Sequence, residues 1–152
     1  MPQIRKLLVT TDLSEAAEVA LPMAAMLADK LGASVSVLTV VELTPQLPPG
    51  VLSLPPEREK ELEREVRERV LARLQELRER HLPDGSETLV ELGGGEHCAD
   101  RICAVANERG VDMIVIATHG RGKVAQLLLG SVAERVVRTA TCPVMTVSTY
   151  DR

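Results

Sequence analysis

A short stretch of the chain combines glycines, cations and a helix start in the way that a bound phosphate requires. Gly120 and Gly122 can adopt positive φ and allow close backbone approach, which builds a concave array of N–H groups. Arg121 and Lys123 add two positive charges to the same loop. Nine residues separate Gly120 from the pair Gly130–Ser131, which precedes a helical pattern, and a helix N-terminus favours an anion. Together these residues predict a phosphate site.

The polar residues near this stretch also have purely structural interpretations. Ser131 and Glu134 form the Ser-x-x-Glu pattern of a capping box, so Ser131 could simply start a helix. Asp12 could hydrogen-bond ribose hydroxyls or hold a metal ion, or it could form a turn or a cap. His119 could donate to a phosphate or bond to the backbone of its own loop. The residues alone leave both interpretations open.

The cysteines favour buried thiols over a disulfide framework or a metal site. Cys98, Cys103 and Cys142 are an odd number and include no Cys-x-x-Cys pair. His97 lies next to Cys98, but the spacing of a four-ligand zinc site is absent from the sequence. We therefore expect no resident metal on these thiols.

Alternating strand and helix patterns must position the candidate residues. Strands are predicted at residues 4–10, 33–42, 87–92, 111–118 and 143–147, and helices at 14–31, 57–81, 98–109 and 131–139. Pro22 predicts a kink or a break in the first helix, with Asp12 or Ser14 as its cap. Strands that are apolar on both faces need helices on each side, which predicts an α/β fold with a doubly wound parallel sheet. Ligands of such sheets bind at the carboxyl ends of the strands, where the strand order reverses.

Length and composition exclude several classes of protein. At 152 residues, we expect residues 1–152 to form a single domain. The net charge of −4 argues against a nucleic-acid partner, and no apolar run approaches the ~20 residues of a membrane helix. Tyr150 is the only aromatic residue, which disfavours flavin or base stacking. The first residues lack the features of a secretory signal, so we expect a cytoplasmic protein.

Familiar catalytic and nucleotide-binding signatures are absent from the sequence. There is no GxxxxGK[ST] loop, no GxGxxG after a strand and no Gly-x-Ser-x-Gly elbow. P-loop enzymes, dinucleotide-binding Rossmann domains and serine hydrolases are therefore disfavoured. The charged residues of 57–81 predict a solvated helix face, with a coiled-coil partner as the alternative.

With Asp12, the His119–Gly120 loop and Gly130–Ser131 established, the chain resembles the universal stress protein family over nearly its whole length. The ATP-binding branch of that family has the motif Gly, two residues, Gly, nine residues, then Gly-Ser or Gly-Thr. Gly120 and Gly130–Ser131 match it, whereas Ala117 replaces the first glycine and adds one methyl group near the expected nucleotide. The family fold is a five-stranded parallel sheet in the order 3-2-1-4-5, usually dimeric through its last strand.

The resemblance implies a set of nucleotide contacts at one edge of the sheet. For ribose or phosphate they are Thr10, in place of a family proline, and Asp12; for adenine they are Val40, Ile116 and Ala117. The phosphate loop contains His119 and Gly120, beside Arg121. The phosphate-binding helix starts with Gly130, Ser131 and Val132. Asp12 is also expected to hold Mg²⁺ through bound ATP.

The expected function is that of an ATP-binding regulatory protein of the stress response with slow or no hydrolysis. No residue of the sequence stands out as a general base for water. Two alternatives are a nucleotide-free dimeric scaffold of the same fold and a true ATPase, whose phosphate release would be lost in Asp12→Ala. We also expect a homodimer through residues 143–148, because an exposed apolar sheet edge favours pairing.

Overall fold

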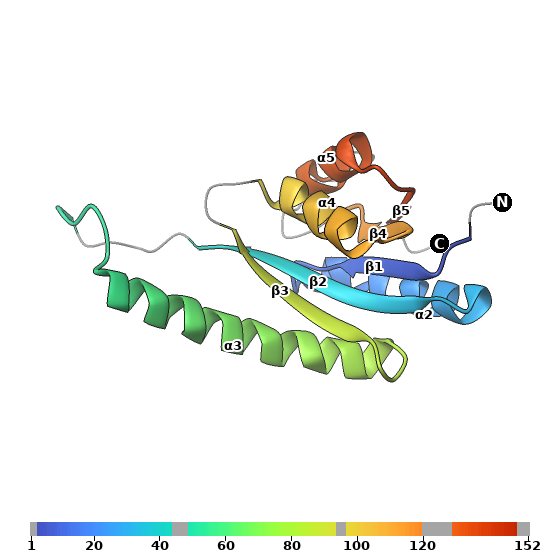
Figure 1. The fold of residues 1–152 in the computed structure, drawn as a ribbon, viewed down its shortest axis with the longest axis horizontal. Helices are drawn as coiled ribbons and strands as arrows, with labels where there is room; N and C mark the ends of the chain where they lie inside the picture. Colours follow the sequence, from blue (N-terminus) through green and yellow to red (C-terminus); the bar gives the residue numbers. More distant parts are fainter. Residues whose placement is uncertain (1–2, 44–48, 94–96, 120–128, 149–152) are drawn as a thin grey trace.

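The chain forms a five-stranded parallel sheet with helices on both faces (Figure 1). The computed structural model describes residues 3–43, 49–93, 97–119 and 129–148. The strands are β1 Lys6–Thr10, β2 Ser34–Glu42, β3 Glu87–Gly93, β4 Met113–Ala117 and β5 Val144–Val147. The helices are α1 Glu15–Glu18, α2 Ala20–Leu31, α3 Pro56–His81, α4 Cys98–Arg109 and α5 Ser131–Thr139. The sheet order β3-β2-β1-β4-β5 confirms the predicted architecture.

The two central strands form the middle of the core because their side chains are apolar on both faces. Leu8 of β1 pairs with Ile114 of β4, and Val9 pairs with Val115. All four side chains are fully buried. Because side chains alternate along a strand, Leu8 and Val9 face opposite layers of helices, so each layer has its own core.

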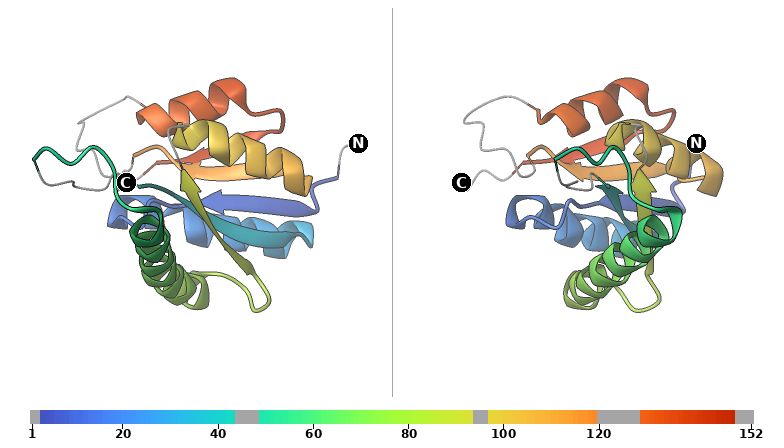
Figure 2. Two further views of the ribbon diagram at one scale, coloured as in Figure 1. Left: turned by 60° about the vertical axis from the view of Figure 1, so that its left-hand side comes forward. Right: turned by 90° about the vertical axis from the view of Figure 1, so that its left-hand side faces the viewer.

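Each face of the sheet has its own pair of large helices (Figure 2). On one face, α2 and α3 pack Leu21 and Leu74 against the side of β1 that carries Val9. On the other face, α4 and α5 pack Ile102 and Val136 against Leu8. No helix in the part of the chain that the structure describes is long and apolar enough to cross a membrane.

The helix predicted at residues 14–31 is in fact two helices, as Pro22 suggested. The interruption falls at Val19, between α1 and α2. Pro22 has no N–H group to donate to the carbonyl of Glu18, so the hydrogen-bond ladder cannot run through this point. The hydroxyl of Ser14 accepts the N–H of Ala17 at 3.2 Å, which identifies Ser14 as the cap of α1.

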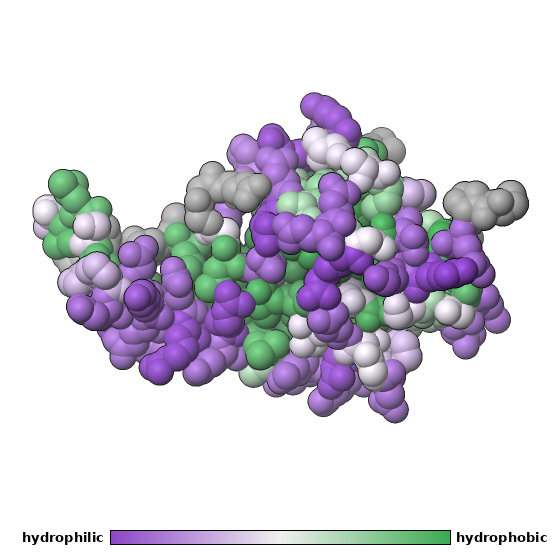
Figure 3. All heavy atoms as spheres, viewed as in Figure 1, coloured by the Kyte–Doolittle hydropathy of each residue, from purple (hydrophilic) through white to green (hydrophobic). Residues whose placement is uncertain are grey.

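The long helix α3 lies along the edge strand β3 and exposes most of its charged residues (Figure 3). Its buried residues are Leu74 and Leu77, so the solvated face expected from the sequence is confirmed. The guanidinium of Arg67 donates to the backbone carbonyl of Val90 at 2.8 Å. This contact covers part of the backbone of β3, which has a neighbouring strand on one side only.

Asp112 holds the two central strands together at their amino ends. Its carboxylate accepts the backbone N–H groups of Arg5 at 2.8 Å and Lys6 at 2.9 Å. These hydrogen bonds hold the pKa of Asp112 below its usual range. With this alignment, Thr10 ends β1 and Ala117 ends β4 at the same edge of the sheet, where the strand order reverses.

Candidate functional site

A cavity of about 530 Å³ lies at the carboxyl ends of β1 and β4. Its volume falls within the range of about 300–1,000 Å³ that is typical of small-molecule sites. The walls come from both central strands, from β2 and from the first turns of three helices. They consist of Thr10, Thr11, Asp12, Ala17, Leu38, Val40, Cys98, Ile102, Ile116, Ala117, Thr118, His119, Leu129, Gly130, Ser131, Val132 and Ala133.

One side of the cavity is aliphatic. Leu38 of β2, Ile102 of α4 and Ile116 of β4 belong to the same core cluster, and Val40 packs against that cluster. These side chains meet here because β2 and β4 flank β1 while α4 crosses above them. A flat apolar group such as a purine ring could pack between such walls without an aromatic partner.

The other side of the cavity contains backbone and imidazole hydrogen-bonding groups. The N–H of Gly130 donates to the carbonyl of Thr118 at 2.6 Å, which joins the start of α5 to the end of β4. A β-carbon at Gly130 would stand 2.9 Å from that carbonyl oxygen, so only glycine fits this approach. The hydroxyl of Thr118 is 2.9 Å from Nδ1 of His119, whose other ring nitrogen is buried.

The capping box predicted at Ser131 is not formed. Gly130 is the cap residue of α5, and its carbonyl accepts the N–H of Glu134 at 2.9 Å. The carboxylate of Glu134 turns forward to Arg138 instead of back to the cap. The cap residue Gly130 has no side chain that could bond to the first N–H groups of α5. Two of these groups belong to Ser131 and Val132, which line the cavity.

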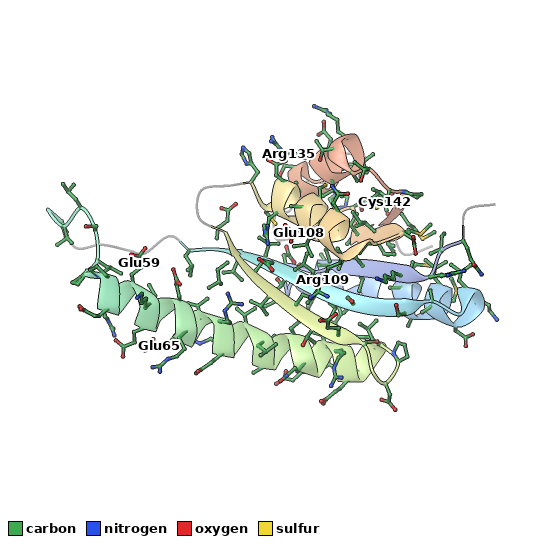
Figure 4. All side chains as sticks on the ribbon, in the orientation of Figure 1. Glu59, Glu65, Glu108, Arg109, Arg135 and Cys142 are labelled. Atoms are coloured by element: carbon green, nitrogen blue, oxygen red, sulfur yellow. The ribbon has the colours of Figure 1, made fainter. Side chains whose placement is uncertain are left out.

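An ion pair joins α4 to α5, and Figure 4 labels its arginine, Arg135, on α5. Arg135 donates from Nε and Nη2 to the two carboxylate oxygens of Asp100, at 2.8 and 2.7 Å. The bond to Arg135 lowers the pKa of Asp100. Because Cys98 and Ser131 begin these two helices and both line the cavity, the pair holds two of its walls together.

Asp12 combines the two interpretations that the sequence left open. Its Oδ1 accepts the N–H of Ser14 at 2.9 Å and the hydroxyl of Ser14 at 2.5 Å, so it shapes the turn after β1. Leu13 within this turn adopts left-handed backbone, with φ of 67°. Asp12 also lines the cavity, which places a carboxylate beside any ligand bound there.

The structure places Cys98 in the cavity wall, where the sequence had suggested only a buried thiol. Burial raises the pKa of Cys98 to about 11, with smaller contributions from the carboxylates of Glu42 and Asp12. The thiol is therefore protonated at neutral pH and contributes a small apolar surface. Within the described ranges, no group of three His, Cys, Asp or Glu side chains could hold a metal ion.

Ala117, which departs from the family motif, lines the cavity but packs in the core on the other face of the sheet from Ile116. Ala117 is 7% exposed and belongs to the core cluster on the α2 side of the sheet, whereas Ile116 belongs to the cluster under α4. The alternation along β4 therefore directs the methyl group of Ala117 away from the aliphatic wall.

Nine of the predicted site residues line this one cavity: Thr10, Asp12, Val40, Ile116, Ala117, His119, Gly130, Ser131 and Val132. Their roles toward a ligand stay predictions. Gly120 and Arg121, the remaining two, lie outside the described residues. The sequence analysis missed eight lining residues: Thr11, Ala17, Leu38, Cys98, Ile102, Thr118, Leu129 and Ala133. Thr11 and Thr118 adjoin predicted residues and could have been included for that reason, while the others carry no polar signal.

Several known proteins that are similar to this chain are universal stress proteins. The model of the universal stress protein family matches residues 3–148. Universal stress protein YxiE of Bacillus subtilis is 31% identical over 145 residues, which cover 93% of this chain and 97% of YxiE. The structure of hypothetical protein MJ0577 of Methanocaldococcus jannaschii is similar with a TM-score of 0.74 and 24% identity, over 99% of this chain and 100% of that one. A universal stress protein solved in complex with cAMP has a TM-score of 0.67 and 24% identity, over 98% and 100% of the two chains.

Proposed function

We propose that this chain, which belongs to the universal stress protein family, binds ATP in the cavity between β1 and β4 and acts as a nucleotide-dependent regulatory protein. The adenine ring lies against Val40 and Ile116, and the phosphates lie at the start of α5. Asp12 contacts the ribose or the phosphates. Hydrolysis is slow or absent.

The observation that carries this proposal is the division of one cavity into an aliphatic side and a helix start. Leu38 and Ile102 offer the apolar surface that a purine needs, and Ser131 and Val132 at the start of α5 line the same cavity. Backbone N–H groups and the helix dipole both favour a phosphate. The neighbour of the same fold that was solved with cAMP supports an adenine nucleotide as the class of ligand.

We propose that Mg²⁺ binds only together with the phosphates of the nucleotide. Mg²⁺ prefers six oxygen ligands and usually takes one or two carboxylates plus phosphates and water. Asp12 is the carboxylate that lines the cavity, so the phosphates and water would supply the other ligands.

The hydrogen bonding of Asp12 supports the proposal that hydrolysis is slow or absent. Its Oδ1 already accepts two hydrogen bonds from Ser14. We infer that this oxygen, engaged by both groups of Ser14, does not act as a general base for water. Binding and release of the nucleotide, rather than its turnover, is then the event that a partner protein would sense.

The test is to denature the purified protein, analyse the supernatant for adenine nucleotides, and titrate nucleotide-free protein with ATP by calorimetry. We expect released nucleotide or micromolar binding of ATP. A protein that carries no nucleotide and gives no heat with ATP, GTP or AMP would contradict the proposal. That result would favour the alternative of a nucleotide-free scaffold.

We also propose that the protein is a homodimer through β5. The two edges of the sheet differ: Arg67 and α3 cover backbone of β3, whereas β5 is a short edge strand with Val144, Met145 and Val147 only half-buried. An apolar edge strand of this kind favours pairing with a second copy.

A further inference from the structure

The ring nitrogen Nε2 of His119 is a buried polar atom without a hydrogen-bond partner among the residues that the structure describes. Buried polar atoms almost always have a partner in folded proteins, so an unpaired one calls for a physical explanation. His119 lines the cavity of about 530 Å³. A ligand bound in this cavity would supply the partner that Nε2 lacks.

Thr118 connects His119 to two other elements of the fold. Its N–H donates to the carbonyl of Val147 at 2.9 Å, which ties it to β5. Its own carbonyl accepts the N–H of Gly130 at 2.6 Å, which ties it to the start of α5. Its hydroxyl lies 2.9 Å from Nδ1 of His119. With its backbone held at both ends, Thr118 presents this hydroxyl to the imidazole from a fixed position.

The direction of the hydroxyl–imidazole bond decides what Nε2 offers to a ligand. If the Thr118 hydroxyl donates to Nδ1, the ring hydrogen of neutral His119 sits on Nε2, which is then a donor. If Nδ1 donates to the hydroxyl, Nε2 is an acceptor. A β-carbon at Gly130 would be 3.9 Å from the Cα of His119, so His119 lies beside the start of α5. The start of a helix favours an anionic oxygen of a ligand. Such an oxygen accepts a hydrogen bond from a protonated Nε2, whereas the lone pair of an unprotonated Nε2 repels it.

We propose that Thr118 is a positioning residue that donates to Nδ1 of His119, fixes the ring hydrogen on Nε2, and thereby directs an N–H donor at an anionic phosphate oxygen of the ligand. This inference rests on the proposed binding of a nucleotide. It adds a specific residue, a specific tautomer and the part of the ligand that is contacted.

The first test measures the affinities of ATP and adenosine by calorimetry for the wild type, Thr118→Val and Thr118→Ser. Valine keeps the shape and both backbone bonds of Thr118 but removes the hydroxyl, whereas serine keeps the hydroxyl. We expect Thr118→Val to weaken ATP binding about tenfold, the size of one hydrogen bond to a charged group. Thr118→Ser should stay within about twofold of the wild type, and adenosine should bind equally to all three.

Thr88→Val is the matched control, because Thr88 is a half-buried threonine of β3 that does not line the cavity. We expect this variant to bind ATP as the wild type does. Thermal unfolding of all variants separates a loss of affinity from a loss of folded protein.

The second test reads the tautomer directly from long-range ¹H–¹⁵N NMR spectra of the histidine side chains. The chain has three histidines, and His119→Gln identifies the signals of His119 by their disappearance. We expect Nε2 to be the protonated nitrogen in the wild type and a mixture of tautomers in Thr118→Val. Glutamine also places an amide near the position of Nε2, so His119→Gln should retain more ATP affinity than His119→Ala.

The outcomes separate this inference from the proposed function. A wild-type protein that binds no ATP overturns both. A wild-type protein that binds ATP overturns the inference alone if Thr118→Val binds equally well, or if the NMR signals place the hydrogen on Nδ1. An equal loss of ATP and adenosine affinity would show that Nε2 contacts the adenine base or the ribose, which also overturns the inference.

Discussion

Gly130 shows how one residue can serve the fold and the site together. Its φ of −57° is open to any residue, so its backbone conformation does not require glycine. The requirement comes from the carbonyl of Thr118, which would stand 2.9 Å from a β-carbon. A larger side chain must therefore move the start of α5 away from β4, and the proposed phosphate site opens with it.

We expect Gly130→Val to weaken ATP binding at least about tenfold and to lower the free energy of unfolding by about 1–3 kcal/mol, the usual cost of overpacking. Calorimetric titration and thermal unfolding measure the two effects. The control is Gly110→Ala, at a left-handed position (φ 62°) after α4 that does not line the cavity. It should lose about 1 kcal/mol of stability with unchanged ATP affinity. Equal affinity of Gly130→Val and the wild type would mean that the phosphates lie elsewhere.

At the scale of elements, the interrupted first helix is joined to the end of α3 by an ionic contact. The carboxylate of Glu18 accepts hydrogen bonds from Nε2 of His81 at 2.6 Å and from the guanidinium of Arg80 at 3.2 Å. The hydrogen bond from His81, with help from Arg80, lowers the pKa of Glu18 below its ordinary 4.5. The turn that contains Asp12 leads directly into α1, and Ser14 of that turn caps the helix. The contact that holds α1 against α3 therefore also supports this turn.

A carboxylate whose pKa is lower in the folded state stabilises the protein above its unfolded pKa, and this stabilisation is lost as the pH falls through the folded pKa. We therefore expect Glu18→Gln to lower the free energy of unfolding by up to about 1 kcal/mol at pH 7. The difference from the wild type should shrink as the pH falls below about 4.5. Denaturant unfolding at several pH values measures it.

Glu76→Gln is the control for this variant, because Glu76 pairs with Arg73 on the exposed surface of α3. We expect it to change stability by a few tenths of a kcal/mol. A Glu18→Gln variant whose deficit stays constant down to pH 3 would show that the contact is steric and not ionic.

At the scale of the whole molecule, the two sheet edges have different surroundings. The helix α3 and Arg67 shield β3, while β5 pairs with β4 on one side and ends the sheet. Thr118, through its bond to Val147, connects this open edge to the cavity. A second copy that pairs with β5 would therefore adjoin the strand that supports the proposed phosphate site.

We expect Thr146→Lys to convert the proposed dimer to a monomer, because Thr146 is the exposed residue of β5 and a charge on an edge strand opposes pairing. Light scattering at micromolar concentration measures the mass. Gln75→Lys adds the same charge at an exposed position of α3 and should leave the dimer intact. A wild-type protein that is already monomeric would contradict the dimer.

The sequence by itself determined a parallel sheet with helices on both faces, and the family resemblance added the strand order. Buried strands such as Met113–Ala117 are apolar on both faces, and this local pattern requires a covered parallel sheet. The positions of Asp12 and His119 follow from the same pattern, because each lies two residues after the end of a strand.

Only the tertiary structure decided which apolar side chains form the cavity and how its polar side is held. Leu38, Ile102 and Cys98 look like ordinary core residues in the sequence, and they meet because β2 and α4 pack beside β1. The helix begins at Ser131 as predicted, but the possible capping box is not formed, because Gly130, bound to Thr118, is the cap residue. Local patterns specify what each segment can form, but contacts between distant segments select among those possibilities.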